Sequence, residues 1–344
     1  MRRIPQLDGL RGIAILMVFA AHALHVPMLW MGVDLFFVLS GYLITGILLH
    51  LREQRELEGY WGPFYLRRAR RILPPYIGFL IFAAVVFAPT WRHIWYWYAF
   101  FAANFPLALG KVPVQAMAPL WSLAVEEQFY LIWPLIVLRC ENDRLRRIAL
   151  SVVVLAPVLR AAATPLFSSH FPIYSLTPFR ADTLAFGAFI AVAENEDRGW
   201  VGSMRQASFW GSLASGTLLL ALSFGHSFRT GANSVLFNTA GYSLSVMMFG
   251  GAVIYALGIR EGVVHYLLTL APLRYLGRIS YTFYLYHVAA LIIVARYLDS
   301  STMRAVVGFA VTGAIAALSW YGIESPILKR RSRVIATPGR AVAA

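Results

Sequence analysis

Apolar runs of nearly membrane length recur along the whole sequence. A helix needs about 20 mainly apolar residues to cross a bilayer, and the 344-residue chain is 59% hydrophobic but only 13% charged. A typical soluble domain carries about twice that charged fraction. The pattern therefore predicts an all-α fold, a polytopic membrane helix bundle of about ten transmembrane helices. The expected spans are 8–26, 31–51, 73–90, 119–138, 148–166, 179–194, 208–225, 236–258, 279–297 and 305–322.

Lysine and arginine determine the expected orientation of this bundle. The run 94–109, IWYWYAFFAANFPLAL, is ambiguous, because its crossing would place the basic loop 139–147 outside. Short cytoplasmic loops concentrate Lys and Arg, so we expect 94–109 to be a re-entrant or interfacial segment and both termini to be cytoplasmic. The net charge of +14 then belongs to loops that face anionic lipid, not to a nucleic-acid surface. The predicted location is the bacterial cytoplasmic (inner) membrane.

The sequence indicates one integral membrane domain over residues 1–344. Residues 7–326 are expected to form the bundle and 327–344 a basic cytoplasmic tail. The first apolar segment lacks a convincing small-residue cleavage motif and is expected to be retained as a helix. The single cysteine, Cys140, excludes an intramolecular disulfide. The spacing of histidines and carboxylates predicts no metal site, and no tightly bound cofactor is expected.

The first membrane-length segment, 7–26, carries the ionisable residues Asp8, Arg11 and His22. Such groups cost several kcal/mol at membrane depth, so they usually face a protein interior or a wet cavity. Arg11 and His22 lie eleven residues apart, which puts both on one helix face about 16 Å apart along the axis. The glycines that flank Arg11 predict the close approach of a partner helix or a ligand. This polar stripe indicates a site that acts through the membrane.

Six further motifs combine polar residues or glycines with apolar helix. They are MGVDLFFVLSGYLITG (31–46), FYLRRARRILPPY (64–76), PLWSLAVEEQFYLIWP (119–134), FRADTLAFGAF (179–189), GRISYTFYLYHV (277–288) and YGIESP (321–326). Together with the Arg11–His22 spacing, the chain resembles the acyltransferase-3 family of integral membrane acyltransferases. Some members carry a fused SGNH-type esterase domain; this sequence shows none and is expected to be the standalone form.

The resemblance implies a membrane O-acyltransferase. Its donor substrate is cytoplasmic acyl-CoA, with acetyl-CoA as the default, and its acceptor is a hydroxyl of an extracytoplasmic carbohydrate or glycolipid. His22 is expected to act as the general base that takes the proton of this hydroxyl. Glu126 is expected to orient His22 or to hold its protonated form, with an ordinary ion pair to an arginine as the alternative. Asp34 is the third candidate catalytic residue, or else a helix cap.

The candidate residues for binding acyl-CoA or acceptor are mostly cationic. Arg11 suits a phosphate or a carboxylate. The basic run 67–71 matches the family pattern that the resemblance assigns to acyl-CoA phosphates, with Arg70 and Arg71 as candidates and a lipid-facing patch as the alternative. Ser122 is expected to be a hydrogen-bond partner rather than a nucleophile. The full binding set is Arg11, Arg70, Arg71, Arg180, Asp182, Tyr284 and His287; a structural pair of Arg180 with Asp182 and a packing role for His287 remain open.

A transporter or exporter of a carbohydrate or anionic substrate is the competing function. Ionisable residues in membrane spans also mark translocation pathways. The lack of an inverted internal repeat counts against this alternative. Direct transfer without an acyl-enzyme is favoured, because no residue stands out as a nucleophile. The identity of the acceptor and the length of the acyl chain stay open.

Overall fold

The computed structural model describes residues 4–26, 28–54, 57–87, 95–112, 114–224 and 233–329. These residues form helices joined by short connections, and none of them lies in a strand. The predicted all-α fold is confirmed. The long helices are α1 (Pro5–Ala23), α2 (Gly32–Glu53), α3 (Leu57–Val86), α6 (Leu120–Arg139), α7 (Asn142–Ala163), α9 (Thr177–Glu196), α10 (Trp200–Ser223), α11 (Tyr242–Gly258), α13 (Ala271–Val294) and α14 (Ser301–Ser319).

Each of the ten expected spans overlaps one of these long helices. Seven helical stretches in the described part are long and apolar enough to cross a membrane, and they include α2, α3, α7, α9, α11, α13 and α14. The protein is therefore a multi-pass membrane protein. The other three, α1, α6 and α10, have sufficient length but less apolar character. In α1 and α6 this is because ionisable residues such as Arg11 and Glu126 interrupt the apolar sequence.

The ambiguous run 94–109 does not form a long helix. Within its described residues it folds into α4 (Trp95–Ala99) and α5 (Asn104–Ala108), each five residues long. A helix of that length covers about a quarter of the hydrocarbon core. Residue 94 and most of the expected basic tail, 330–344, lie outside the described residues.

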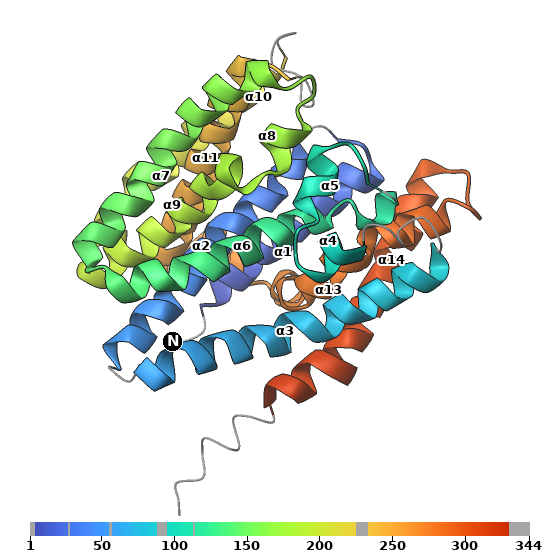
Figure 1. Ribbon diagram of the computed structural model, residues 1–344, viewed down its shortest axis with the longest axis horizontal. Coiled ribbons are helices and arrows are strands. Elements are labelled where there is room, and N and C mark those ends of the chain that lie inside the picture. Colours follow the sequence, from blue (N-terminus) through green and yellow to red (C-terminus); the bar gives the residue numbers. More distant parts are fainter. Residues whose placement is uncertain are drawn as a thin grey trace, which may run out of the picture.

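Helix α2 is at the centre of the bundle. Its apolar stretch is 83% buried, compared with 28% for α3 and α7 and 17% for the stretch that contains α14. It packs against α9, α6 and α1 and contributes residues to both hydrophobic clusters of the interior, for example Phe37 to one and Val38 to the other. In Figure 1, α7, α9, α10 and α11 lie on one side of α2, and α3, α13 and α14 lie on the other.

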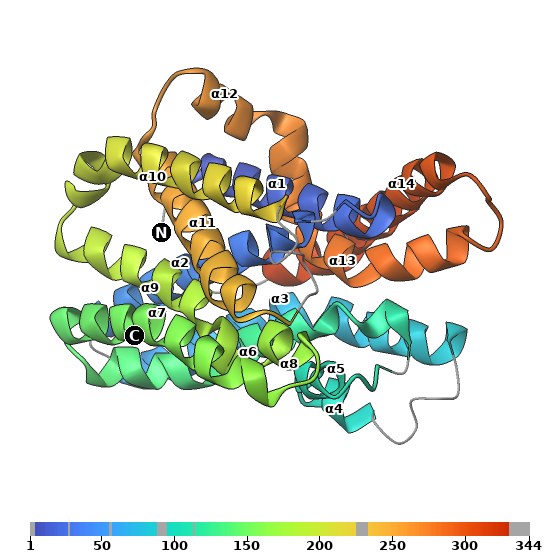
Figure 2. The ribbon, with the colours of Figure 1, turned by 90° about the horizontal axis from the view of Figure 1, so that it is seen from above.

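Two pairs of helices approach so closely that their backbones touch. A Cβ atom on Gly277 of α13 would lie 1.9 Å from the carbonyl oxygen of Asp8 on α1, and one on Gly41 of α2 would lie 1.9 Å from that of Leu184 on α9. Only glycine fits such contacts, as in other membrane helix pairs. The close approach predicted beside Arg11 is confirmed, with a helix as the partner. The short helix α12 (Val263–Thr269) lies at the edge of the bundle, next to α1 (Figure 2).

Candidate active site

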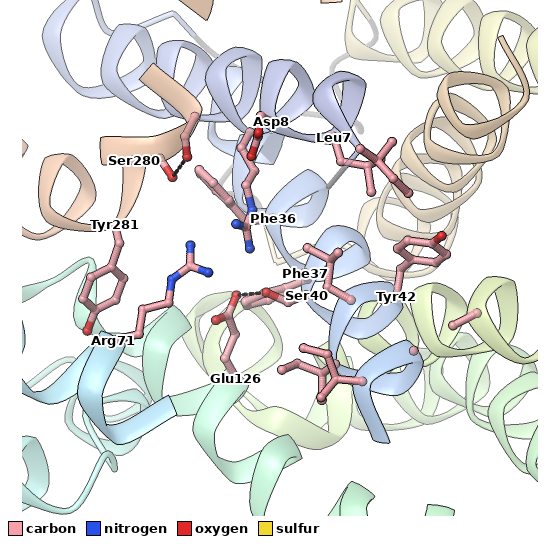
Figure 3. A pocket seen from close by; sticks show the side chains of 18 of the residues that line it. Leu7, Asp8, Phe36, Phe37, Ser40, Tyr42, Arg71, Glu126, Ser280 and Tyr281 are labelled. Atoms are coloured by element: carbon pink, nitrogen blue, oxygen red, sulfur yellow. Dashed lines mark hydrogen bonds between the residues drawn. The ribbon is translucent and has the colours of Figure 1, made fainter. Parts of the chain in front are cut away.

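A large cavity opens between α1, α2, α3, α6 and α13, and its volume is about 1510 Å³. That exceeds the range of about 300–1,000 Å³ typical of pockets for drug-sized ligands. Polar and apolar side chains line it together, among them Phe36, Ser40, Arg71 and Glu126 (Figure 3). A cavity of this size and mixed character suits a long ligand with a charged part and an apolar or neutral part.

Arginine dominates the ionisable lining of this cavity. Carboxylates line it as well, but they are fewer. The arginines are Arg11, Arg67, Arg68, Arg71, Arg198, Arg260 and Arg278, and the acids are Asp8, Glu53, Glu126, Glu127 and Glu194. The guanidinium group is always charged and binds phosphate and carboxylate oxygens in a bidentate manner. The lining therefore favours an anionic ligand.

The arginines differ in whether the protein itself neutralises them. Arg68 donates to Glu127 across 2.9 Å, and its guanidinium carbon lies 3.3 Å from the centre of the Tyr130 ring. Arg11 and Arg71 are half-buried, and neither has a hydrogen bond or an ion pair within the described part of the chain. A half-buried cation is costly without a partner. Arg278 also lines the cavity, is half-buried and has no hydrogen bond or ion pair among the described residues. Arg11, Arg71 and Arg278 are thus half-buried lining cations placed to receive an external anion.

Arg70 occupies a different position from its neighbours. The side chains of Arg67, Arg68 and Arg71 line the cavity, whereas Arg70 is not part of its wall. Successive helical residues are rotated by about 100°, so Arg70 lies outside the arc that the other three share. Of the two arginines expected to bind acyl-CoA, the structure brings only Arg71 to the cavity.

Glu126 is held inside the cavity by two hydroxyl groups. Ser40 of α2 donates to one carboxylate oxygen across 3.0 Å, and Tyr130 donates to the other across 3.2 Å. The side chain of Arg71, on α3, points toward Glu126 and Ser40 (Figure 3). The expected contact of Glu126 with His22 is wrong, because the hydrogen-bond partners of His22 lie on α1 and α13.

His22 lies near the C-terminal end of α1, outside the cavity lining, and is exposed. Its Nδ1 atom is 2.9 Å from the carbonyl oxygen of Val18 and 3.3 Å from Nε2 of His287. The two imidazole rings meet edge to face with their centres 4.9 Å apart. His287 is fully buried, and its Nδ1 atom is 2.6 Å from the carbonyl oxygen of Tyr284. The two histidines therefore form a pair.

Tyr284 connects the cavity to this histidine pair. It lines the cavity and lies one helical turn before His287. Its hydroxyl is 2.6 Å from Oγ of Ser122 and donates to the carbonyl oxygen of Pro119 across 3.0 Å. Ser122 also lines the cavity and acts as a hydrogen-bond partner, as expected. Tyr284 thus belongs both to the cavity wall and, through its carbonyl oxygen, to the surroundings of the histidine pair.

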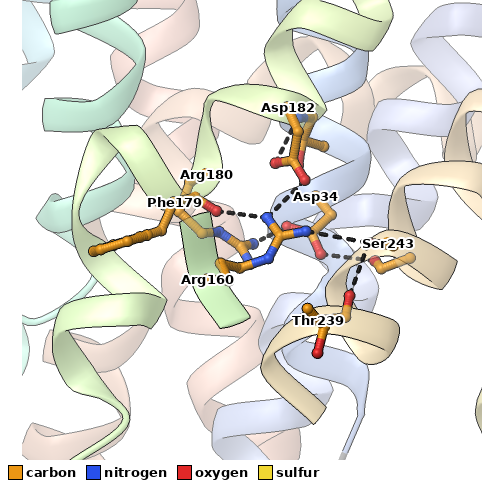
Figure 4. Close-up of polar contacts among 9 residues, drawn as sticks. Asp34, Arg160, Phe179, Arg180, Asp182, Thr239 and Ser243 are labelled. Atoms are coloured by element: carbon orange, nitrogen blue, oxygen red, sulfur yellow. Dashed lines mark hydrogen bonds and ion pairs between the residues drawn. The ribbon is translucent and has the colours of Figure 1, made fainter. Parts of the chain in front are cut away.

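Asp34, Arg180 and Asp182 lie elsewhere, in a buried network that the cavity does not reach (Figure 4). Arg180 forms an ion pair with Asp34, and Arg160 of α7 forms one of 2.7 Å with Asp182. All four side chains are at most 3% exposed. Ser245 donates to Asp34 across 2.7 Å. This closed set joins α2, α7, α9 and α11.

The expected roles of these residues change accordingly. Asp34 was a candidate catalytic residue, and Arg180 and Asp182 were candidates for binding substrate, but the carboxylates face arginines rather than the cavity. Arg180 pairs with Asp34 and not with the expected Asp182. Sequence reasoning gave Arg160 no role, although a lone arginine inside an apolar span is itself a signal. The geometry is that of a buried ion-pair network that holds helices together and does not line the cavity.

The comparisons with known proteins identify the family. A family model described as an acyltransferase domain matches residues 4–323. The chain belongs to this acyltransferase family. The match covers every long helix that lines the cavity, and it confirms the family predicted from the motifs.

Relatives of this chain include a protein of Listeria monocytogenes and one of Staphylococcus aureus. Peptidoglycan O-acetyltransferase OatA of Listeria monocytogenes is 29% identical over 359 residues, which cover 95% of this chain and 56% of that protein. O-acetyltransferase OatA of Staphylococcus aureus is 26% identical over 378 residues, covering 97% of this chain and 59% of that protein. The chain thus spans little more than half the length of these relatives. No solved structure gives a significant match.

The buried network of Asp34, Arg160, Arg180 and Asp182 predicts a stability effect. Asp34→Ala leaves Arg180 buried without its carboxylate, and removing one partner of a buried pair costs about 3–5 kcal/mol. We expect a marked fall in Tm in detergent. The matched control is the double variant Asp34→Leu with Arg180→Met, which leaves no charge unpaired and should melt closer to the wild type. If the Asp34→Ala protein melted like the wild type but were inactive, the structural role would be wrong and Asp34 would again be a candidate catalytic residue.

Proposed function

We propose that this protein is a membrane O-acyltransferase that moves an acyl group, with acetyl as the first candidate, from cytoplasmic acyl-CoA to a hydroxyl of an extracytoplasmic carbohydrate or glycoconjugate. One observation carries the proposal. A cavity lined by arginines, some of them half-buried without an ion pair among the described residues, extends to Tyr284, beside a histidine pair. Family membership and relatives named as O-acetyltransferases support it.

The cavity suits a donor with phosphates at one end and a thioester at the other. Arg11 and Arg71 are free to bind phosphate or carboxylate oxygens of the donor, and guanidinium groups do so with bidentate geometry. Arg11 lies about 16 Å along α1 from His22. A donor anchored at Arg11 and Arg71 would therefore have to extend its acyl end along α1, toward Tyr284 and Ser122.

The proposed chemistry needs a base, and His22 is the candidate. A sugar hydroxyl is a weak nucleophile at neutral pH, so a positioned histidine that accepts its proton accelerates the attack. The hydroxyl oxygen forms a bond to the acyl carbon, the carbon–sulfur bond breaks, and the thiolate of CoA leaves. The proton taken by His22 then neutralises this thiolate. No acyl-enzyme is required, because donor and acceptor meet directly.

The proposed topology has ten crossings, with both termini and the mouth of the cavity in the cytoplasm. Under it, the ends of α2, α9 and α11 that contribute Glu53, Asn195 and Leu257 to the cavity face the same side as the start of α1. His22 and the segment with α4 and α5 then lie toward the outer face. The basic loops fall on the cytoplasmic side, in accordance with their charge.

The single cysteine offers a direct test of this topology. Cys140 follows α6 and is half-buried, and we expect a membrane-impermeant maleimide to label it only after the cells are permeabilised. The matched control is Tyr297→Cys in a Cys140→Ser background, because Tyr297 is 81% exposed in the loop after α13. That variant should react in intact cells. Labelling of Cys140 in intact cells would contradict the orientation.

Turnover of acetyl-CoA by the purified chain in lipid nanodiscs tests the function itself. An acyltransferase should bind acetyl-CoA and release CoA, faster when a peptidoglycan fragment is added. Peptidoglycan is the first acceptor to test, because the Listeria relative is named for it. A protein that neither binds nor cleaves any acyl-CoA would exclude the proposal and favour a transporter.

A further inference from the structure

The ring of His287 on α13 lies within hydrogen-bond distance of the candidate base His22, although 265 residues separate them in the sequence. The imidazole is fully buried and makes polar contacts on both sides, with the carbonyl oxygen of Tyr284 and with the ring of His22. A histidine that only fills space in an apolar core needs one partner for its single N–H. In His287 both ring nitrogens have a polar contact, Nδ1 with the carbonyl oxygen of Tyr284 and Nε2 with Nδ1 of His22.

The carbonyl groups fix which nitrogens carry protons. A backbone carbonyl can only accept a hydrogen bond, so the Nδ1 atom of His287, 2.6 Å from the oxygen of Tyr284, must carry a hydrogen. The opposite tautomer would place two lone pairs against each other at that distance. In neutral His287 the Nε2 atom is then the unprotonated one. It faces His22 as an acceptor.

The same reasoning extends to His22. Its Nδ1 atom lies between two acceptors, the oxygen of Val18 at 2.9 Å and Nε2 of His287 at 3.3 Å. It must therefore carry a hydrogen, which the two acceptors share. In neutral His22 the lone pair is left on Nε2, the nitrogen that neither contact occupies. A general base needs such a free lone pair, directed away from the groups that hold the ring in place.

We propose that His287 is a positioning residue for acyl transfer, which holds His22 in the tautomer whose Nε2 atom accepts the proton of the attacking hydroxyl. The proposal rests on the proposed function, in which His22 is the base. His287 accepts from Nδ1–H of His22 and so also stabilises the imidazolium that forms when the hydroxyl proton arrives at Nε2. In catalytic triads and metal sites a neighbouring acceptor performs this task for histidine.

The surrounding helices are suited to keep this geometry. The backbones of α1 and α13 touch at Gly277, where a Cβ atom would lie 1.9 Å from the carbonyl oxygen of Asp8. The ring of Tyr284 lies 5.5 Å from that of His287, and its hydroxyl is bonded to Ser122 and Pro119. Because Tyr284 also lines the cavity, the histidine pair is held next to the same wall that a bound acyl group would contact.

Two substitutions of His287 test this role. His287→Leu keeps the apolar packing but removes the acceptor, and we expect acyl transfer to fall about 10–100-fold, the usual cost of losing a residue that orients a functional histidine. The KM for acetyl-CoA should stay within about twofold, because His287 does not line the cavity. His287→Gln places an amide oxygen near the former Nε2 position and should recover much of the lost rate.

The tautomer of His22 is measured independently, by ¹⁵N NMR of histidine-labelled protein in nanodiscs without any substrate. We expect a protonated Nδ1 in the wild type and in His287→Gln, and a tautomer mixture in His287→Leu, where among the described contacts of His22 the carbonyl oxygen of Val18 remains as acceptor. A pure Nε2–H tautomer in the wild type, unchanged turnover in His287→Leu, or no rescue by His287→Gln in a folded protein would overturn the proposal. Since this readout needs no donor, a wild type that fails to cleave acetyl-CoA would refute the proposed function without deciding the tautomer.

Discussion

Replacing His22 by glutamine is expected to lower acyl transfer by about 10²–10⁴-fold, the usual contribution of a general base. Glutamine keeps the size and polarity of the side chain, but its amide cannot take up the hydroxyl proton. The affinity for acetyl-CoA should stay within about twofold, since His22 is not part of the cavity wall. Steady-state turnover and equilibrium binding of acetyl-CoA, measured on the same preparation, separate the two effects.

The matched control for this variant is His25→Asn. His25 is an exposed histidine in the same segment, and its backbone φ of 53° lies in the left-handed region that asparagine tolerates well. Turnover should be unchanged in this variant. If His22→Gln turned over acetyl-CoA at the wild-type rate, or if it lost binding and turnover to the same extent, the role of His22 as base would be wrong.

Replacing Arg71 by glutamine is expected to weaken acetyl-CoA binding by about 10–100-fold. A hydrogen bond to a charged group contributes about 1.5–3 kcal/mol, and 1.4 kcal/mol is a factor of ten in Kd. Arg71 lines the cavity and has no ion-pair partner among the described residues. The same reasoning applies to Arg11→Gln. Titration of each variant with acetyl-CoA at fixed salt gives the change in Kd.

Arg70 provides the control within the same helix. Arg70→Gln removes the same charge one residue away, but Arg70 does not line the cavity, so the Kd for acetyl-CoA should change by less than about threefold. Acetyl-pantetheine, which lacks the nucleotide phosphates, provides a control on the ligand, and Arg71→Gln should bind it like the wild type. Equal losses in Arg70→Gln and Arg71→Gln would show that only the overall charge matters.

The arrangement of the spans could be predicted because lipid imposes a length and a composition on each helix. Each of the ten expected spans overlaps a long helix, and the run 94–109 forms only two short helices within its described residues. The shared face of Arg11 and His22 also followed from helical geometry. Local periodicity does not reveal which neighbour each side chain meets, however, and there the predictions were less successful.

Contacts between distant helices account for the residues that sequence reasoning misplaced. In the run RRARR, helical periodicity separates Arg70 from the others, but it does not say which arc faces a cavity. The pairing of His22 with His287 joins helices at opposite ends of the chain, so no spacing could reveal it. Asp34 matches a motif, and motifs do not distinguish a catalytic carboxylate from one buried in an ion pair.

The most direct test of the whole account separates donor and acceptor across a membrane. Proteoliposomes with uniform orientation receive ¹⁴C-acetyl-CoA on the side of Cys140 and a peptidoglycan fragment on the other side. We predict that label appears on the fragment in the wild type and is lost in His22→Gln. Label that appears only when donor and acceptor share one side, or no cleavage of acetyl-CoA at all, would contradict transfer through the cavity to His22.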